Sequence, residues 1–219
     1  MKSPLLPLLA IAFSAMPLYE QTSPAPAAAK TSTANATTLT KEERTRAIDY
    51  LKETQKEFLD AINGLSDAQW KFKAAPDRWS IAEVAEHIAV TEEMIWKLVS
   101  EKIMKSPATP EKRAEVAGKD ELILTKIPDR SRKAQAPEPL RPTGRFATKA
   151  DLAKSYEATR SAEIAYVGDT QEDLRDHFEE HPAFKTMDAY QWLIFNGAHN
   201  KRHTAQIMEV KADPNYPKS

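Results

Sequence analysis

The fold of this chain is decided by residues 196–207, which read NGAHNKRHTAQI. The stretch is typical of a helix and carries two histidines, His199 and His203, four residues apart. At about 100° per residue, positions i and i+4 lie on one face of a helix, one turn apart. That face is otherwise apolar, so we expect both imidazoles to point inward. It consists of Trp192, Phe195, His199, His203, Gln206 and Val210.

An inward histidine pair at i and i+4 is a common way for a helix to bind a transition metal, but two ligands do not complete a site. His87 is the best third ligand, because it borders the apolar stripe of a second helical segment at residues 80–92. Packed antiparallel, the two helices would form a three-histidine site with an open coordination position, as expected of a catalytic metal. The alternative is that the histidines are hydrogen-bonded core residues.

The two remaining histidines, His177 and His181, are also four residues apart. Acidic residues surround them, and Pro182 ends any helix there. We therefore predict that this pair lies at the surface, and the alternative is that one of the two is a metal ligand.

Two motifs resemble those of a known family. Residues 78–88 read RWSIAEVAEHI and resemble the W-S-x-x-E-x-x-x-H signature of the DinB-like superfamily of metal-dependent hydrolases. Residues 199–207 read HNKRHTAQI and are similar to its H-x-x-R-H-x-x-Q-I signature, and the similar layout extends over residues 40–216. The resemblance implies an up-and-down four-helix bundle, often dimeric, with a three-histidine site for one divalent metal. The implied ligands are His87, His199 and His203.

The expected fold class is therefore all-α, with four long helices. The first begins at Thr40 with a capping box and ends at Gly64. The second is capped by Ser80, the third starts near Thr148, and Thr186 or Asp188 caps the fourth. Glu83 is expected to complete the Ser80 cap, although it could instead orient a metal ligand.

Residues 106–148 are expected to form a long irregular crossover between the second and third helices, because six prolines exclude a long helix there. We expect this crossover to cover the metal pocket. Its basic side chains could favour an anionic substrate or could simply be solvated. They include Arg130, Arg132, Lys133, Arg141 and Arg145.

Four residues on the third and fourth helices are candidates for the substrate pocket, although bundle packing explains the first equally well. They are Tyr156, Arg160, Trp192 and Asn196.

The N-terminus has the features of an export signal. Residues 1–29 combine Lys2, an apolar run interrupted by prolines, and small residues that suit a cleavage site, which predicts a periplasmic or secreted protein. An uncleaved anchor or a disordered tail is the alternative. Residues 30–39 are expected to form a disordered linker before the domain at 40–216.

Composition excludes several functions. With no cysteine, the chain has no disulfide, thiolate ligand or cysteine nucleophile. Lys+Arg 31 balances Asp+Glu 32, which argues against nucleic acid as a partner.

We expect a divalent metal (zinc, nickel or iron), a small-molecule substrate and no stable membrane span after processing, and the family resemblance alone implies a homodimer. The expected chemistry is hydrolysis. The alternatives are a thiol-dependent transferase or isomerase of the same superfamily, which export disfavours, and a metal- or ligand-binding bundle without turnover.

Overall fold

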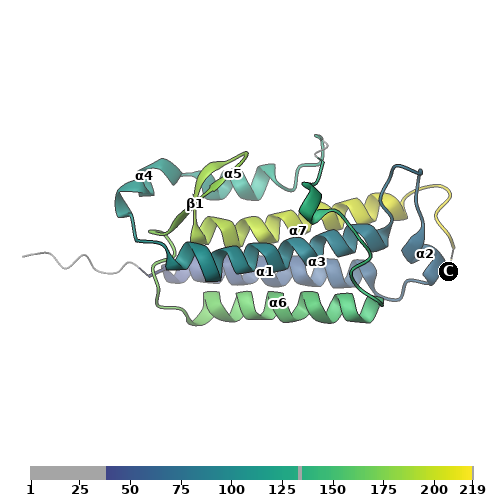
Figure 1. The fold of residues 1–219 in the computed structure, drawn as a ribbon, viewed down its shortest axis with the longest axis horizontal. Helices are drawn as coiled ribbons and strands as arrows, with labels where there is room; N and C mark the ends of the chain where they lie inside the picture. Colours follow the sequence, from purple (N-terminus) through teal and green to yellow (C-terminus); the bar gives the residue numbers. More distant parts are fainter. Residues whose placement is uncertain (1–37, 133–134, 219) are drawn as a thin grey trace, which may run out of the picture. The chain divides into compact units, whose positions relative to one another are not determined.

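The computed structural model describes residues 38–132 and 135–218 (Figure 1). The predicted signal peptide at 1–29 and residues 30–37 of the predicted linker lie outside the described residues, so both stay predictions. Leu39 is already buried, two residues before the first helix. In the described part of the chain, no helix is both long enough and apolar enough to cross a membrane.

Capping boxes begin the first two long helices where the sequence predicts them. Helix α1 spans Lys41–Ile62; the Thr40 hydroxyl accepts from the Glu43 amide, and the Glu43 carboxylate accepts from the Thr40 amide. Helix α3 spans Ile81–Lys97 and begins with the same reciprocal pair of bonds. These bonds satisfy backbone N–H groups that have no partner inside the helix.

Two further long helices complete the bundle. Helix α6 spans Lys149–Asp169 and starts where the sequence predicts; its cap is Thr148, whose hydroxyl accepts from the Asp151 amide. Helix α7 spans Ala189–Lys211, and the carboxylate of Asp188 accepts from the backbone amide of Gln191, the third residue of that helix, at 2.7 Å. Of the two residues that the sequence offers as the cap of this helix, Thr186 and Asp188, the structure shows Asp188.

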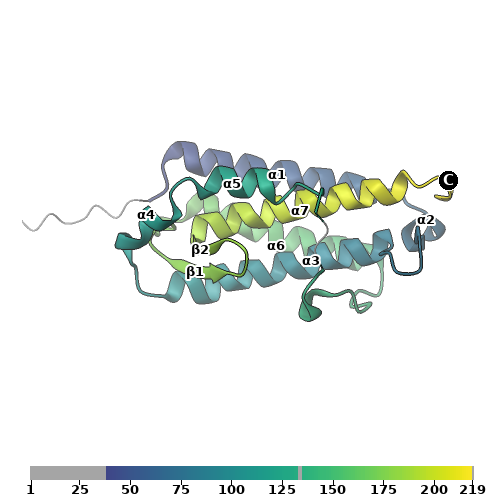
Figure 2. The same ribbon diagram turned by 90° about the horizontal axis from the view of Figure 1, so that it is seen from above.

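Helices α1 and α3 each pack against both α6 and α7 (Figures 1 and 2). One hydrophobic cluster joins Phe58, near the end of α1, to Val84, near the start of α3. The same cluster contains Leu152 from the start of α6 and Ile207 from the end of α7. Thus α1 and α7 run in one direction, and α3 and α6 run in the other.

The predicted all-α four-helix bundle with a long crossover is confirmed. The structure adds the direction of the third long helix: the crossover returns the chain to the end of the bundle where α3 began, so α6 lies parallel to α3. Short elements occupy the connections. They are α2 (Asp67–Lys71) before α3, and α4 (Arg113–Val116), α5 (Lys119–Lys126) and single 3₁₀ turns in the crossover.

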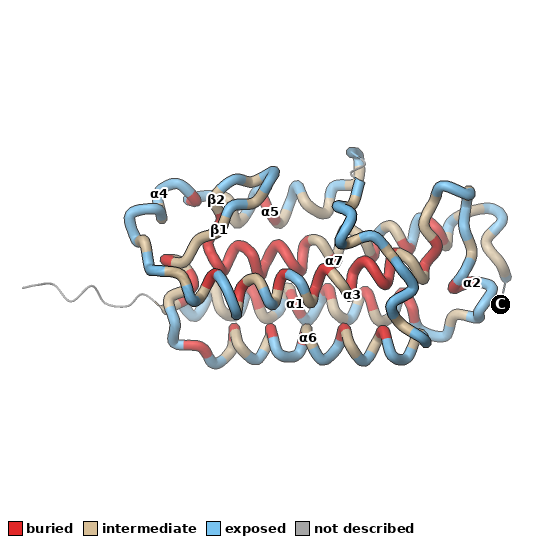
Figure 3. The backbone as a smooth tube through the Cα atoms, in the orientation of Figure 1, coloured by how far each residue is buried: buried red, intermediate tan, exposed pale blue. Residues whose placement is uncertain are grey.

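The first half of α7 is covered on all sides. Residues 189–198 are buried without interruption, as Figure 3 shows along this helix. The long helices α1 and α3, the short helix α5 and strand β2 pack against it. A helix that is covered all round needs side chains of low polarity over its whole circumference. The sequence provides them from Ala189 to Phe195 except at Gln191, whose amide donates to the Val116 carbonyl at 3.0 Å. The cover ends at His199, the first half-buried residue after this run.

A β-hairpin that the helical pattern did not predict lies between α6 and α7. Strands β1 (Phe178–His181) and β2 (Lys185–Asp188) pair antiparallel, with His181 opposite Lys185 at the turn. The hairpin follows from short-range pairing that a search for helical periodicity does not detect.

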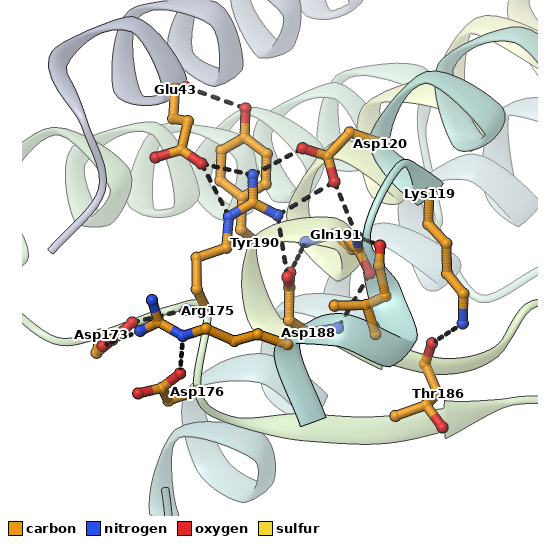
Figure 4. Close-up of polar contacts among 12 residues, drawn as sticks. Glu43, Lys119, Asp120, Asp173, Arg175, Asp176, Thr186, Asp188, Tyr190 and Gln191 are labelled. Atoms are coloured by element: carbon orange, nitrogen blue, oxygen red, sulfur yellow. Dashed lines mark hydrogen bonds and ion pairs between the residues drawn. The ribbon is translucent and has the colours of Figure 1, made fainter. Parts of the chain in front are cut away.

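A cluster of acidic residues around Arg175 connects the start of α7 to the rest of the bundle (Figure 4). The guanidinium of Arg175 donates to Glu43 at 2.7 Å, to Asp120 at 2.7 Å and to Asp188 at 2.9 Å. It also lies 3.9 Å from the ring centre of Tyr190. The cluster joins α1, α5 and α7 through one side chain and so holds the hairpin against α7.

Candidate metal centre

Three histidines converge between α3 and α7. His87 comes from α3, and His199 and His203 come from adjacent turns of α7. One ring nitrogen of each lies within 4.8 Å of the others. The Nε2 atoms of His87 and His199 are 3.2 Å apart. The antiparallel packing of α3 and α7 therefore brings together the three residues that the sequence predicted.

The spacing of the His87 and His199 nitrogens fits a bound metal ion. Two nitrogens bound to tetrahedral zinc at about 2.0–2.1 Å lie about 3.3–3.4 Å apart. The 3.2 Å between His87 Nε2 and His199 Nε2 is close to this value. The donor set, three imidazoles, also suits a divalent transition metal.

Two of the imidazoles are held with the Nε2 lone pair free for a ligand bond. His87 Nδ1–H donates to the Leu140 carbonyl at 2.8 Å, and His203 Nδ1–H donates to Gln206 Oε1 at 2.9 Å. Both partners are acceptors, so they assign the proton to Nδ1 in each ring. Arg130 also donates to Gln206 Oε1, at 3.3 Å, which fixes the orientation of that amide. Such partners orient metal-binding histidines and raise their affinity.

The carboxylate of Glu86 positions the crossover above His87. It is 7% exposed and accepts from the backbone amides of Thr143 at 2.7 Å, Gly144 at 3.0 Å and Arg145 at 3.1 Å. These bonds hold the segment that carries the Leu140 carbonyl. The sequence does not reveal this role, because a backbone carbonyl has no signature in it and Glu86 resembles any other helix glutamate.

A second segment of the crossover is held by α7. Arg202 donates to the carbonyl of Ile127 at 3.1 Å, to that of Arg132 at 2.6 Å, and to that of Asp129. Arg130 pairs with Glu209 at 2.6 Å. The crossover therefore borders the histidine site on two sides.

The basic residues of the crossover are largely engaged within the protein. Besides the pair between Arg130 and Glu209, Arg145 pairs with Glu93 at 2.6 Å, and Arg141 donates to the Ala136 carbonyl at 3.2 Å. These contacts give Arg130, Arg141 and Arg145 partners within the protein, which neither the anionic-substrate interpretation nor the solvated-loop interpretation had included. Lys133 lies outside the described residues.

Burial lowers the pKa of all three histidines. For His203 the pKa falls to about 3, and for His199 it falls well below its usual range, with the neighbouring imidazoles adding to the effect. The pKa of His87 is lowered by burial and partly restored by its bond to the Leu140 carbonyl. All three rings are therefore neutral near neutral pH, the form that binds metals. His87 is buried, whereas His199 and His203 are half-buried, so solvent reaches the site from one side.

Glu83 acts as a helix cap, as expected. It accepts from the Ser80 amide at 2.7 Å and pairs with Lys73 at 2.8 Å. Its carboxylate is thus occupied at the start of α3.

The candidate pocket residues of α6 lie inside the bundle. Arg160 is fully buried and pairs with both carboxylate oxygens of Glu92, one of them at 2.6 Å. Tyr156 is also fully buried, and its hydroxyl accepts from Asn200 Nδ2 at 2.6 Å. Their assignment to a substrate pocket stays a prediction, while the structure gives both a role in joining the helices.

The candidate pocket residues of α7 differ from each other. Asn196 is buried and its Nδ2 donates to Glu163 at 3.2 Å inside the bundle. Burial and the neighbouring Glu92 raise the pKa of Glu163 well above its usual range. Trp192 instead lies against Phe195, at 5.7 Å between ring centres, and Phe195 stacks on His199. Their assignment to a pocket also stays a prediction.

His181 differs from the prediction of a surface pair. Its ring is half-buried and lies 4.8 Å from Phe195 and 5.3 Å from Trp192, between ring centres. The hairpin turns this histidine toward α7, an arrangement that depends on strand pairing rather than on helical spacing.

The chain matches the DinB superfamily over residues 50–207. It is 29% identical over 161 residues to the uncharacterized protein YuaE of Bacillus subtilis (strain 168), which covers 73% of this chain and 93% of that protein. It also shares its fold with YfiT from Bacillus subtilis, at a TM-score of 0.51 and 15% identity, over 82% of this chain and 91% of that one. YfiT is described as a probable metal-dependent hydrolase with an unusual four-helix bundle topology.

The histidine site and the four-helix bundle agree with the family that this comparison identifies. The protein belongs to the DinB superfamily, as its two sequence motifs predict. The match spans both long helices that carry the three histidines, α3 and most of α7.

Proposed function

We propose that this protein binds one divalent metal ion through His87, His199 and His203, and that it is a metal-dependent hydrolase acting on a small molecule. The convergence of three neutral imidazoles, two of them oriented by hydrogen bonds from Nδ1, carries the proposal. A divalent ion bound there would supply Lewis-acid chemistry, polarising a substrate oxygen and making water more acidic. The half-buried His199 and His203 leave one side of the site accessible to a substrate.

The metal proposal is tested by elemental analysis of the purified protein. We expect about one zinc, nickel or iron ion per chain in the wild type. His87→Ala and His199→Ala should lose it, while His177→Ala, a change of a histidine on the hairpin segment, should retain it. A wild type that stays metal-free after incubation with zinc or nickel would show that the histidines are core residues.

The hydrolase proposal requires turnover as well as binding. Metal-loaded protein is assayed with panels of esters, amides and thiol conjugates, and the activity should be abolished by a chelator and restored by the metal. Transfer to a low-molecular-weight thiol without hydrolysis would instead support the transferase interpretation. Metal binding without turnover of any panel member would support a binding bundle.

Export and dimerisation are separate proposals. Lys2, the apolar run and the small residues before position 30 support export, and the family resemblance supports a dimer. Mass spectrometry of exported protein should find a new N-terminus near residue 30, and intact Met1 in the cytoplasm would contradict this. Light scattering should give the mass of a dimer; a monomer would contradict it.

A further inference from the structure

His181 presents a fixed hydrogen-bond donor at the tip of the hairpin. Its Nδ1 accepts from the backbone amides of Ala183 and Phe184, both at 3.1 Å. In a neutral imidazole, an accepting Nδ1 requires the proton to be on Nε2. Burial lowers the pKa of His181, which favours this neutral form. The ring therefore has one orientation and one N–H group, Nε2–H, to donate.

The ring of His181 lies one aromatic residue away from the histidine site. The ring centre of His181 is 4.8 Å from that of Phe195, and Phe195 stacks on His199 at 6.2 Å with 30° between the planes. Phe195 and His199 are one turn apart on α7, so a single aromatic ring separates His181 from a proposed ligand.

His181 belongs to a group of four packed rings that we call the aromatic wall. It consists of His181, Phe184, Trp192 and Phe195, whose neighbouring ring centres are 4.8–6.3 Å apart. Trp192 Nε1–H is buried and has no hydrogen-bond partner among the described residues. Buried donors without partners are rare, and each one marks a place where water or a ligand is expected. The wall therefore combines apolar ring faces with N–H groups.

We propose that His181 is a substrate-positioning residue, whose Nε2–H donates a hydrogen bond to an oxygen of a substrate held at the three-histidine site. The aromatic wall then binds a flat apolar group of the same substrate, attached to the carbon atom that carries this oxygen. This inference rests on the proposed function and names its substrate class, which is an acyl compound with an aromatic group, such as an aryl ester or amide. A neutral imidazole N–H suits a carbonyl oxygen and the negative charge that develops on it during hydrolysis.

Two substitutions separate this role from a purely structural one. The side-chain oxygen of asparagine takes the place of Nδ1, so His181→Asn keeps the acceptor for the Ala183 and Phe184 amides and removes the donor. Glutamine reaches as far as Nε2, so His181→Gln keeps a donor there and loses the turn acceptor. His177→Asn is the matched control on the same segment of chain.

The experiment measures benzoate binding to the zinc-loaded full-length chain by calorimetry, with zinc content determined for every variant. We expect His181→Asn to bind zinc normally and to bind benzoate about three- to tenfold more weakly, the equivalent of one hydrogen bond. His181→Gln and His177→Asn should stay within about twofold of the wild type, because the donor is retained in both.

Each contrary result has its own meaning. A wild type without zinc would overturn the proposed function, and this inference with it. Zinc-loaded wild type that does not bind benzoate would overturn the aromatic wall as a binding surface. Equal benzoate affinity in all variants would overturn the role of His181, and weaker binding in His181→Gln but not in His181→Asn would show that the histidine only stabilises the turn.

Discussion

The bond between His87 and the Leu140 carbonyl depends on Glu86, and this dependence can be tested with Glu86→Gln. Glutamine has almost the same shape, so it leaves packing intact. One of its two terminal groups is an amide –NH₂, which cannot accept a hydrogen bond. The substitution therefore weakens the attachment of the crossover without creating a cavity.

The structure gives the size of the effect. Glu86 Oε1 accepts from the amides of Thr143 and Arg145, and Oε2 accepts from the amide of Gly144 at 3.0 Å. In the glutamine variant, Oε1 keeps its bonds, now without the charge, and the –NH₂ group faces the Gly144 N–H. Loss of one hydrogen bond to a charged acceptor at this buried site should lower the free energy of unfolding by about 2–3 kcal/mol.

The substitution Glu86→Gln should also lower the affinity of the site for a metal. A looser Leu140 carbonyl holds the His87 ring less firmly, and loss of such support usually lowers metal affinity by about 10- to 100-fold. Urea unfolding of the metal-free protein measures the first effect, and competition with a zinc chelator measures the second. Glu93→Gln is the control: Glu93 pairs with Arg145 and Lys97 at the surface, so its loss should cost less than about 1 kcal/mol and leave zinc affinity unchanged. Unchanged zinc affinity in Glu86→Gln would refute the reasoning.

Three further changes test other parts of the structure. Because burial lowers the pKa of His203 to about 3, the unfolded chain binds more protons than the folded chain below about pH 6.5. Urea titrations of metal-free protein should therefore show that the free energy of unfolding falls as the pH is lowered from about 6.5 toward 3. The fall should be less steep in His203→Ala. Arg175→Met leaves three carboxylates without their guanidinium, and denaturant unfolding should show a loss of about 3–5 kcal/mol. A Cβ at Gly197 would lie 3.0 Å from the ring of Tyr50, so Gly197→Ala should show a net loss of about 1 kcal/mol in the same assay, despite the better helix propensity of alanine.

Matched variants control for these changes. Arg46→Met removes an exposed pair with Glu121 and should cost at most about 1 kcal/mol, so an equal loss in Arg175→Met would contradict a special role for the cluster. A Cβ at Gly168 would meet only Ile48, at 3.9 Å, so Gly168→Ala should stabilise α6 by about 0.5–1 kcal/mol. The same sign for both glycine substitutions would contradict the close packing of α1 and α7. A stability profile that is flat from pH 6.5 to pH 4 would contradict the neutral imidazoles.

The sequence alone determined the long helices and the three histidines that now lie together. Capping bonds such as the one between Thr40 and Glu43 depend on residues three apart, and the spacing of His199 and His203 depends on one helical turn. Interactions of this range are read directly from the order of residues. His87 followed from its position on the apolar stripe of a second helix and from the resemblance to the family.

Only the tertiary structure decided what surrounds those histidines. The Leu140 carbonyl is 53 residues from His87, and Glu86 binds backbone amides 57 to 59 residues away. The direction of α6 and the approach of His181 to α7 likewise depend on the path of the crossover and on strand pairing. Backbone groups are the same in every residue and contacts at this distance obey no period, so these features arise only when the bundle is assembled.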